Sequence, residues 1–213
     1  MKKPALLDLR PCQFVLGMKE VESKIEKIRK LKGKALRAYL DNHVIPLVRG
    51  PNREHYIIDH HHFLRACWEL QIDDYSVHLM EDLSHLSEPD FWNKMVKRDW
   101  TYLHDQFGFG PHLPAALPVD IRCLADDPFR SLVWAVIDSG AIKKQAIPFF
   151  EFKWAAFFRL ILPVRLHSKS DFKKVTEEAV ELATSRAADH LPGYTGPTKS
   201  KNPSRKATGK KSR

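Results

Sequence analysis

The chain has 213 residues, of which 43% are hydrophobic and 29% are charged, as is ordinary for a soluble globular protein. This length suits one domain, or one domain with an appendage, and is sufficient to bury a substantial core. The formal net charge is +9, but seven basic residues and no acidic residue fall within 193–213, which leaves about +2 for residues 1–192. The composition therefore excludes a folded part that is strongly basic throughout.

The cysteines and the apolar segments indicate a cytoplasmic protein. Cys12, Cys67 and Cys123 are an odd number, widely spaced and without a CxxC pair, which predicts reduced thiols. Asp8 and Arg10 interrupt the first apolar run, so no signal peptide is expected. No segment approaches the roughly 18 apolar residues of a membrane span, and no membrane partner is expected.

The first 86 residues read as a small α/β unit. Gly50-Pro51-Asn52 has the composition of a hairpin turn, and Pro46 predicts an edge or a strand start. A helix beginning after Gly17 is expected to close at Gly33. Strands are predicted at 5–11, 44–48, 55–58 and 76–80, and helices at 18–32, 35–40 and 59–72.

From Ser87 the pattern becomes helical. Helices are predicted at 87–107, 127–140, 149–162 and 171–190, with Ser87, Asp127 and Ser170 at helix starts. The aromatic residues of 149–158 surround their helix, which favours a place in the core over a base-stacking surface. The prediction is an α+β chain: an N-terminal α/β unit (1–86), a helical half packed on it (87–192) and a disordered basic tail (193–213).

The strongest chemical signal is the joint at Asp59-His60-His61-His62, where an apolar strand meets a helical pattern. Asp59 is predicted to be the N-cap residue, because its carboxylate can accept from the unpaired amides of the first turn. These amides and the positive end of the helix dipole favour an anion. The joint therefore predicts phosphate binding, with His60 in the binding loop and His61 or His62 transferring a proton.

Two other interpretations of the joint stay open. Three consecutive side chains cannot all reach one metal ion, so at most one or two histidines would be ligands, and no metal site is predicted. Alternatively, Asp59 simply caps a helix with histidines facing solvent.

A family resemblance enters at several short motifs. In the first half they are LRPCQ (9–13), G (17), EV (20–21), K (24), YIIDHHH (56–62) and RA (65–66). In the second half they are DPFRSL (127–132), FFEFKW (149–154) and R (159). The chain resembles the ParB-like nuclease family, a bacterial branch of the ParB/sulfiredoxin superfamily, over roughly residues 5–165. The joint is similar to the superfamily's D/G-G-x-H-R phosphate loop, with His60 in place of the glycine and Phe63 in place of the arginine.

The resemblance implies a ParB/sulfiredoxin-like N-terminal unit and a nucleotide or phosphate held at 59–62. Superfamily members bind and hydrolyse CTP, use ATP, phosphorylate free serine or are called nucleases. By this resemblance Glu20 becomes a candidate base and Lys24 a phosphate ligand, with Mg²⁺ and a nucleotide (ATP, ADP or CTP) as possible cofactors. The joint has no cysteine, which argues against sulfiredoxin chemistry, and no partition-type helix-turn-helix is evident.

Several candidates have structural alternatives. Glu20 and Lys24 could be an exposed i, i+4 pair. Arg10 and Arg65 could bind phosphate, or Arg65 could lie on a solvated helix face. Arg130 belongs to a helix start, from which it could reach the joint.

The predicted function is phosphate chemistry at Asp59–His62, by a ParB-like nuclease or by a nucleotide-dependent phosphotransferase. The alternative is a non-catalytic nucleotide- or DNA-binding module of the ParB type. In either case the basic tail could contact nucleic acid nonspecifically.

Overall fold

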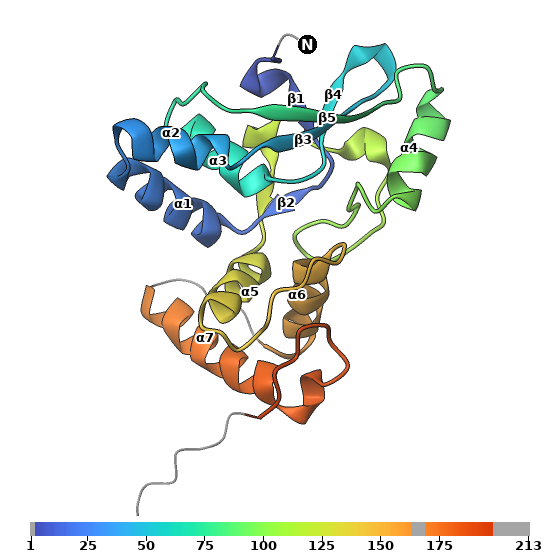
Figure 1. The fold of residues 1–213 in the computed structure, drawn as a ribbon. Helices are drawn as coiled ribbons and strands as arrows, with labels where there is room; N and C mark the ends of the chain where they lie inside the picture. The colour runs from blue at the N-terminus through green and yellow to red at the C-terminus, as the bar shows by residue number, and fades with distance from the viewer. Residues whose placement is uncertain (1–2, 163–168, 198–213) are drawn as a thin grey trace, which may run out of the picture.

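The computed structural model describes residues 3–162 and 169–197 (Figure 1). A four-stranded sheet lies in the N-terminal unit, in the order β1 (Leu9–Pro11), β4 (His55–Ile57), β3 (Ile45–Arg49), β5 (Val77–Asp82). β1 is parallel to β4 and β5 is parallel to β3, whereas β3 and β4 form the predicted antiparallel hairpin. β3 is internal, so the edge position considered for Pro46 is wrong. Pro46 instead precedes the β3–β4 ladder, which begins at Leu47.

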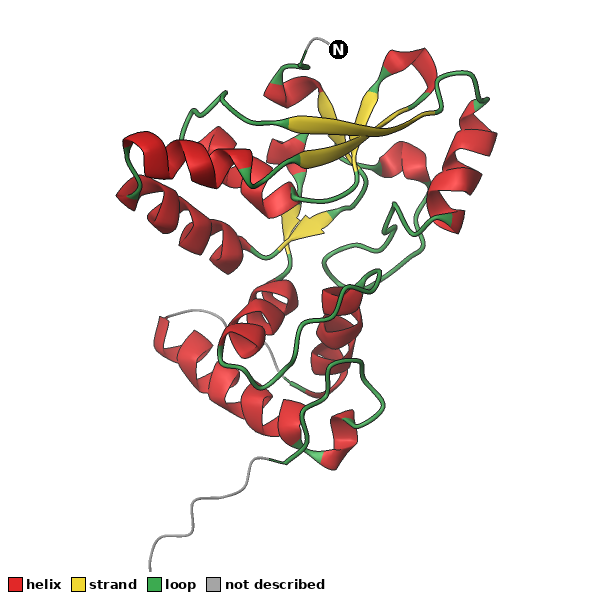
Figure 2. Ribbon diagram, in the orientation of Figure 1, coloured by secondary structure: helices red, strands yellow, loops and turns green. Residues whose placement is uncertain are grey.

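Three helices pack against one face of this sheet (Figure 2). They are α1 (Met18–Lys30), α2 (Gly33–Asp41) and α3 (His61–Glu69). Their apolar stripes meet fully buried strand residues such as Leu9, Leu47 and Ile57. Gly33 does not close α1: it begins α2 with a φ of 52°.

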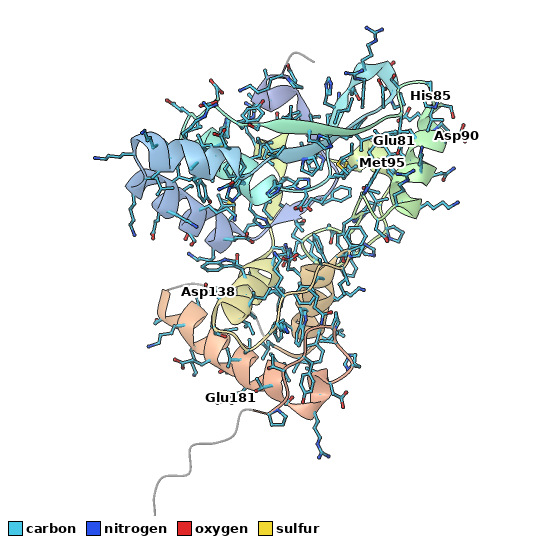
Figure 3. All side chains as sticks on the ribbon, viewed as in Figure 1. Glu81, His85, Asp90, Met95, Asp138 and Glu181 are labelled. Carbon is cyan, nitrogen blue, oxygen red and sulfur yellow. The ribbon has the colours of Figure 1, made fainter. Side chains whose placement is uncertain are left out.

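The other face is covered by α4 (Glu88–Lys97), whose Phe91 and Met95 pack against Val48 and Tyr56. The predicted cap is confirmed, because the Ser87 side chain accepts from the backbone N–H of Asp90. The helix ends ten residues before 107, however, and the predicted stripe does not continue, since Phe107 is 63% exposed. Glu81, His85, Asp90 and Met95 all lie at the β5–α4 end of the unit (Figure 3).

A second hydrophobic cluster forms the helical unit of α5 (Pro128–Asp138), α6 (Phe150–Ile161) and α7 (Lys169–Thr184). Trp154 and Phe158 are fully buried in it, as the aromatic distribution predicted. A two-stranded parallel sheet leads into this unit, formed by β2 (Val15–Leu16) and β6 (Ala125–Asp126). Short 3-10 helices lie at Leu6–Asp8, Pro51–Arg53, Pro114–Ala116, Ile121–Cys123 and Arg186–Ala188.

The end of the described chain packs on the helical unit. Tyr194 forms a bridge with Ile142, and the hydroxyl of Thr195 donates to the carbonyl of Ala141 at 2.8 Å. The predicted tail therefore begins too early at 193, while its seven basic side chains lie outside the described residues. Within residues 3–162 and 169–197, no helix is both long and apolar enough to cross a bilayer.

Candidate functional site

A cavity of about 700 Å³ lies where the sheet unit meets the helical unit. α1 contributes Glu20 and Lys24 to its wall, and the start of α3 contributes residues 59–63. The rest of the chain contributes Arg130 of α5, residues 144–149 and the first turn of α6. The joint singled out in the sequence thus faces a concave site between two units, the usual setting of a ligand pocket.

The start of α3 differs from the predicted cap. His60, not Asp59, is the N-cap residue, with φ 65° and no side-chain cap. The carboxylate of Asp59 instead accepts from the backbone N–H of His60 at 2.6 Å. Asp59 cannot cap because α3 begins two residues later, at His61. The first-turn N–H groups of residues 61–63 consequently have no hydrogen-bond partner within the described chain.

His60, which stands where the resemblance implies a glycine, has a left-handed backbone. A φ near 60° places Cβ close to the following carbonyl in every residue except glycine. The ring of His60 lies against those of His43 and Phe63, with centroids 5.8 and 6.4 Å away. Burial lowers the pKa of His60. The imidazole of His60 is therefore neutral and half-buried at the N-terminus of α3.

The other two histidines bind the backbone. Nε2 of His61 accepts from the N–H of Cys12 at 3.4 Å, and Nε2 of His62 accepts from the N–H of Gly17 at 3.0 Å. Burial lowers the pKa of His61 to about 3 and holds that of His62 well below its ordinary value. Arg130 and Lys24 add to the effect on His62. Both rings are therefore neutral acceptors that position α3, which differs from the free proton-transfer groups expected.

Glu20 and Lys24 both reach the cavity from α1. Their charged groups lie 3.3 Å apart, and the side chains are only 21% and 25% exposed. The other oxygen of Glu20 is 3.6 Å from Nε2 of His62. Since Nε2 already accepts from Gly17, it offers no proton to this carboxylate. The pair is the predicted i, i+4 pair, and it lines the same cavity as the joint.

Arg130 also lines the cavity, with a side chain only 6% exposed. Its Nη2 atom is 3.7 Å from a carboxylate oxygen of Glu151, and its guanidinium carbon lies 4.5 Å from the centre of the Phe152 ring. Its Nε is buried without a hydrogen-bond partner among the described residues. Lys144 donates to the other oxygen of Glu151 at 2.8 Å. Two cations therefore share one carboxylate.

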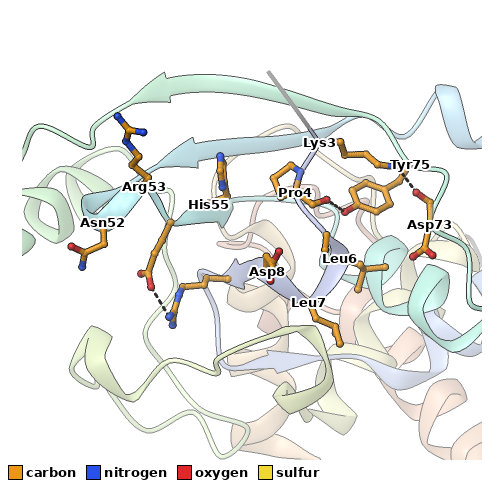
Figure 4. Close-up of a pocket in the computed structure, with 13 residues that line it drawn as sticks. Lys3, Pro4, Leu6, Leu7, Asp8, Asn52, Arg53, His55, Asp73 and Tyr75 are labelled. Carbon is orange, nitrogen blue, oxygen red and sulfur yellow. Dashed lines mark hydrogen bonds and ion pairs between the residues drawn. The ribbon is translucent and has the colours of Figure 1, made fainter.

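Two predicted phosphate ligands lie elsewhere. Arg10 pairs with Glu54 at 2.6 Å beside a different cavity, of about 890 Å³ (Figure 4). Figure 4 shows Asp8, Arg53 and His55 around that second cavity. Arg65 binds Glu69 at 2.9 Å and donates to the carbonyl of Arg122 at 3.3 Å, which ties α3 to a 3-10 helix. Neither arginine is among the residues that line the cavity at the joint.

The sequence did not single out Lys144 and Glu151 as site residues. Glu151 stands within the FFEFKW motif, but nothing in the local pattern marks either charge as part of a site, because the joint to which they are brought lies about eighty residues earlier in the chain. The aromatic residues of 149–158 have two different locations. Trp154 is in the core, whereas Phe149 and Phe152 line the cavity, where Phe152 stacks on Tyr102 with ring centroids 3.8 Å apart.

Comparison with known proteins agrees with this fold. A crystal structure of protein Atu1540 from Agrobacterium tumefaciens is similar, with a TM-score of 0.83 and 37% sequence identity. The similarity covers 92% of this chain and 97% of that one. No curated protein matches the chain. The family model described as "Putative ParB-like nuclease" matches residues 3–160, which include the sheet unit, α5 and all but the last residue of α6, but not α7. The chain therefore belongs to the ParB-like nuclease family.

Proposed function

We propose that this protein binds a phosphate group of a nucleotide or of nucleic acid in the cavity at the joint, and carries out phosphate chemistry there. The observation that supports this proposal is the convergence of positive charge and free donors. Lys24, Arg130 and Lys144 line the same cavity as the uncapped first turn of α3. Helix N-termini and guanidinium groups are both preferred partners of phosphate oxygens.

Glu20 is the residue best placed to act as general base in this proposal. It is a partly exposed carboxylate that lines the cavity, and the ammonium of Lys24, a candidate phosphate ligand, lies 3.3 Å from one of its oxygens. A hydroxyl or water held between Glu20 and the bound phosphate would be activated as the nucleophile. His61 and His62 then have a positioning role, because their Nε2 atoms hold the backbone.

Mg²⁺ fits this site only as a partner of the ligand. The described residues include no group of three or more His, Cys, Asp or Glu side chains placed to hold a metal. Magnesium commonly takes one or two carboxylates and completes its shell with phosphate oxygens and water. Since Glu20 is the proposed base, Asp59 beside the first turn of α3 is the carboxylate of the cavity that would hold the ion. Bound there, the ion would supply charge neutralisation on the phosphate.

Two reactions agree with such a site, and one experiment separates them. The family description favours hydrolysis of phosphodiesters, whereas a compact pocket with a base suits phosphotransfer from a nucleotide equally well. Thermal shifts with Mg²⁺ and ATP, ADP, CTP, GTP or short DNA compare the two. Phosphotransfer predicts stabilisation by a nucleotide, and nuclease activity predicts stabilisation and cleavage of DNA. Absence of every shift would reject the phosphate site.

The alternative is a non-catalytic nucleotide- or DNA-binding module, which the seven basic residues of 199–213 favour. Deleting 198–213 tests it and keeps Tyr194 and Thr195, which contact the helical unit. A module that works through its tail loses salt-dependent DNA binding, because released counterions drive such binding. An enzyme for small nucleotides keeps its affinity and turnover after the same deletion.

A further inference from the structure

We propose that Glu151 is an internal counter-anion of the cavity: its carboxylate holds Arg130 and Lys144 until a phosphate-bearing ligand replaces it. The inference rests on the proposed function, since it concerns the same cavity. It adds a residue that sets how strongly the cavity binds an anion.

The contacts of Arg130 support this role. A buried guanidinium ordinarily satisfies its donors with carboxylates or carbonyls, because an unpaired buried charge is costly. Arg130 is 6% exposed, its Nε has no partner among the described residues, and its contact with Glu151 is long at 3.7 Å. The protein's own side chains therefore satisfy its donors only partly. A phosphate can offer them more oxygens than Glu151 does.

Glu151 and Lys144 have the charges that replacement of the Glu151 carboxylate by a phosphate requires. Burial alone would raise the pKa of Glu151, but Arg130 and Lys144 outweigh it and lower the pKa, so the carboxylate is ionised at neutral pH. Burial opposes the charge of Lys144, and the hydrogen bond to Glu151 overcomes it and raises its pKa. Arg130 and Lys144 both hold the carboxylate of Glu151, so an anion that displaces this carboxylate gains two cationic partners.

Glu151 lies at a helix N-terminus, which is a favourable place for a phosphate. Glu151 lies in the first turn of α6, whose N-cap is Phe149 with φ 55° and no side-chain cap. The N–H groups of residues 151 and 152 have no hydrogen-bond partner within the described chain. The Lys144 side chain is 66% exposed, so it can follow a ligand, whereas buried Arg130 stays in place.

The test is a calorimetric titration with inorganic phosphate at neutral pH. Glu151→Gln keeps the shape and removes the charge, so that binding no longer has to separate two ion pairs. We expect phosphate affinity to rise about tenfold or more. Asp99→Asn is the matched control, because exposed Asp99 lines the same cavity, is not ion-paired in the described structure and has the left-handed backbone that asparagine tolerates. It should raise affinity much less.

Thermal unfolding gives a second readout. Without phosphate, Glu151→Gln should unfold at a lower temperature than wild type, since Arg130 loses its carboxylate. Added phosphate should raise the unfolding temperature of the variant back toward that of wild type. If Glu151→Gln does not fold, Glu151→Asp, which shortens the reach by one methylene, should show a smaller gain in affinity. Unchanged or weaker phosphate binding in these variants, with binding by wild type, overturns the counter-anion role alone. No binding by any of them, wild type included, overturns the proposed phosphate site itself.

Discussion

The ring of His62 accepts a hydrogen bond from the backbone N–H of Gly17, with Nε2 and N 3.0 Å apart. His61 makes the equivalent contact with Cys12 at 3.4 Å. These bonds tie the first turn of α3 to the segment that joins β1 to α1. Since an imidazole nitrogen accepts only when it is unprotonated, the fold requires both rings to be neutral.

This requirement predicts acid sensitivity. Both histidines have lowered pKa values in the folded protein, so below pH about 6.5 the unfolded chain binds more protons than the folded one. The free energy of unfolding therefore falls with decreasing pH below 6.5, for His61 down to about pH 3. Each histidine contributes a slope of up to about 1.4 kcal/mol per pH unit. Urea denaturation at pH 7, 6 and 5 measures it.

Glutamine at position 61 is the control for that prediction. In His61→Gln the amide oxygen can still accept from Cys12, but the side chain no longer titrates. The variant should lose stability less steeply than wild type between pH 7 and 5. Equal slopes in the two proteins would show that His61 does not carry the acid sensitivity.

A pair of substitutions at His60 measures the cost of its left-handed backbone. Glycine and alanine both remove the ring, and only alanine keeps the Cβ that strains φ 65°. We expect His60→Gly to be more stable than His60→Ala by about 1 kcal/mol. Denaturant midpoints at pH 7 give the difference. A more stable alanine variant would contradict the left-handed conformation.

Gly17→Ala should destabilise the protein strongly. A Cβ at Gly17 would lie 2.7 Å from the backbone N of Ser131 and 2.9 Å from the carbonyl carbon of Arg130. Both are backbone atoms at the start of α5, so relief requires the two units to separate locally. We expect a loss of about 1–3 kcal/mol or more, with weaker phosphate binding because Arg130 moves. Gly140→Ala is the control: a Cβ at Gly140 meets no atom within 4 Å, but Gly140, unlike Gly17, has a positive φ. Its loss of stability therefore measures backbone strain without a clash.

Lys24→Ala should lower phosphate affinity about tenfold or more, the usual effect of losing one charged hydrogen bond. Lys19→Ala is its control on the same helix. Lys19 pairs with Glu22 at 2.9 Å and is not among the residues that line the cavity. Calorimetric titration with inorganic phosphate distinguishes them. Equal losses would indicate general electrostatic attraction in place of a contact by Lys24.

Local sequence signals determined most of the elements. The helix starts at Ser87 and Asp127 were predictable because a capping side chain acts on amides within three residues of it. The hairpin at Gly50-Pro51-Asn52 was predictable because turn residues act locally. The cap at Asp59 was wrong, since a short-range rule cannot tell whether a helix begins one residue or two residues after an aspartate.

The sequence by itself predicts an anion site at the strand-to-helix joint, because free amides at such a joint are a local property. Only the tertiary structure decided which side chains surround that joint. It brought Arg130, Lys144 and Glu151 there from more than sixty residues away and placed Arg10 beside another cavity. It also turned two histidines into acceptors for Cys12 and Gly17. Such contacts depend on packing between distant segments, which leaves no periodicity or spacing in the sequence.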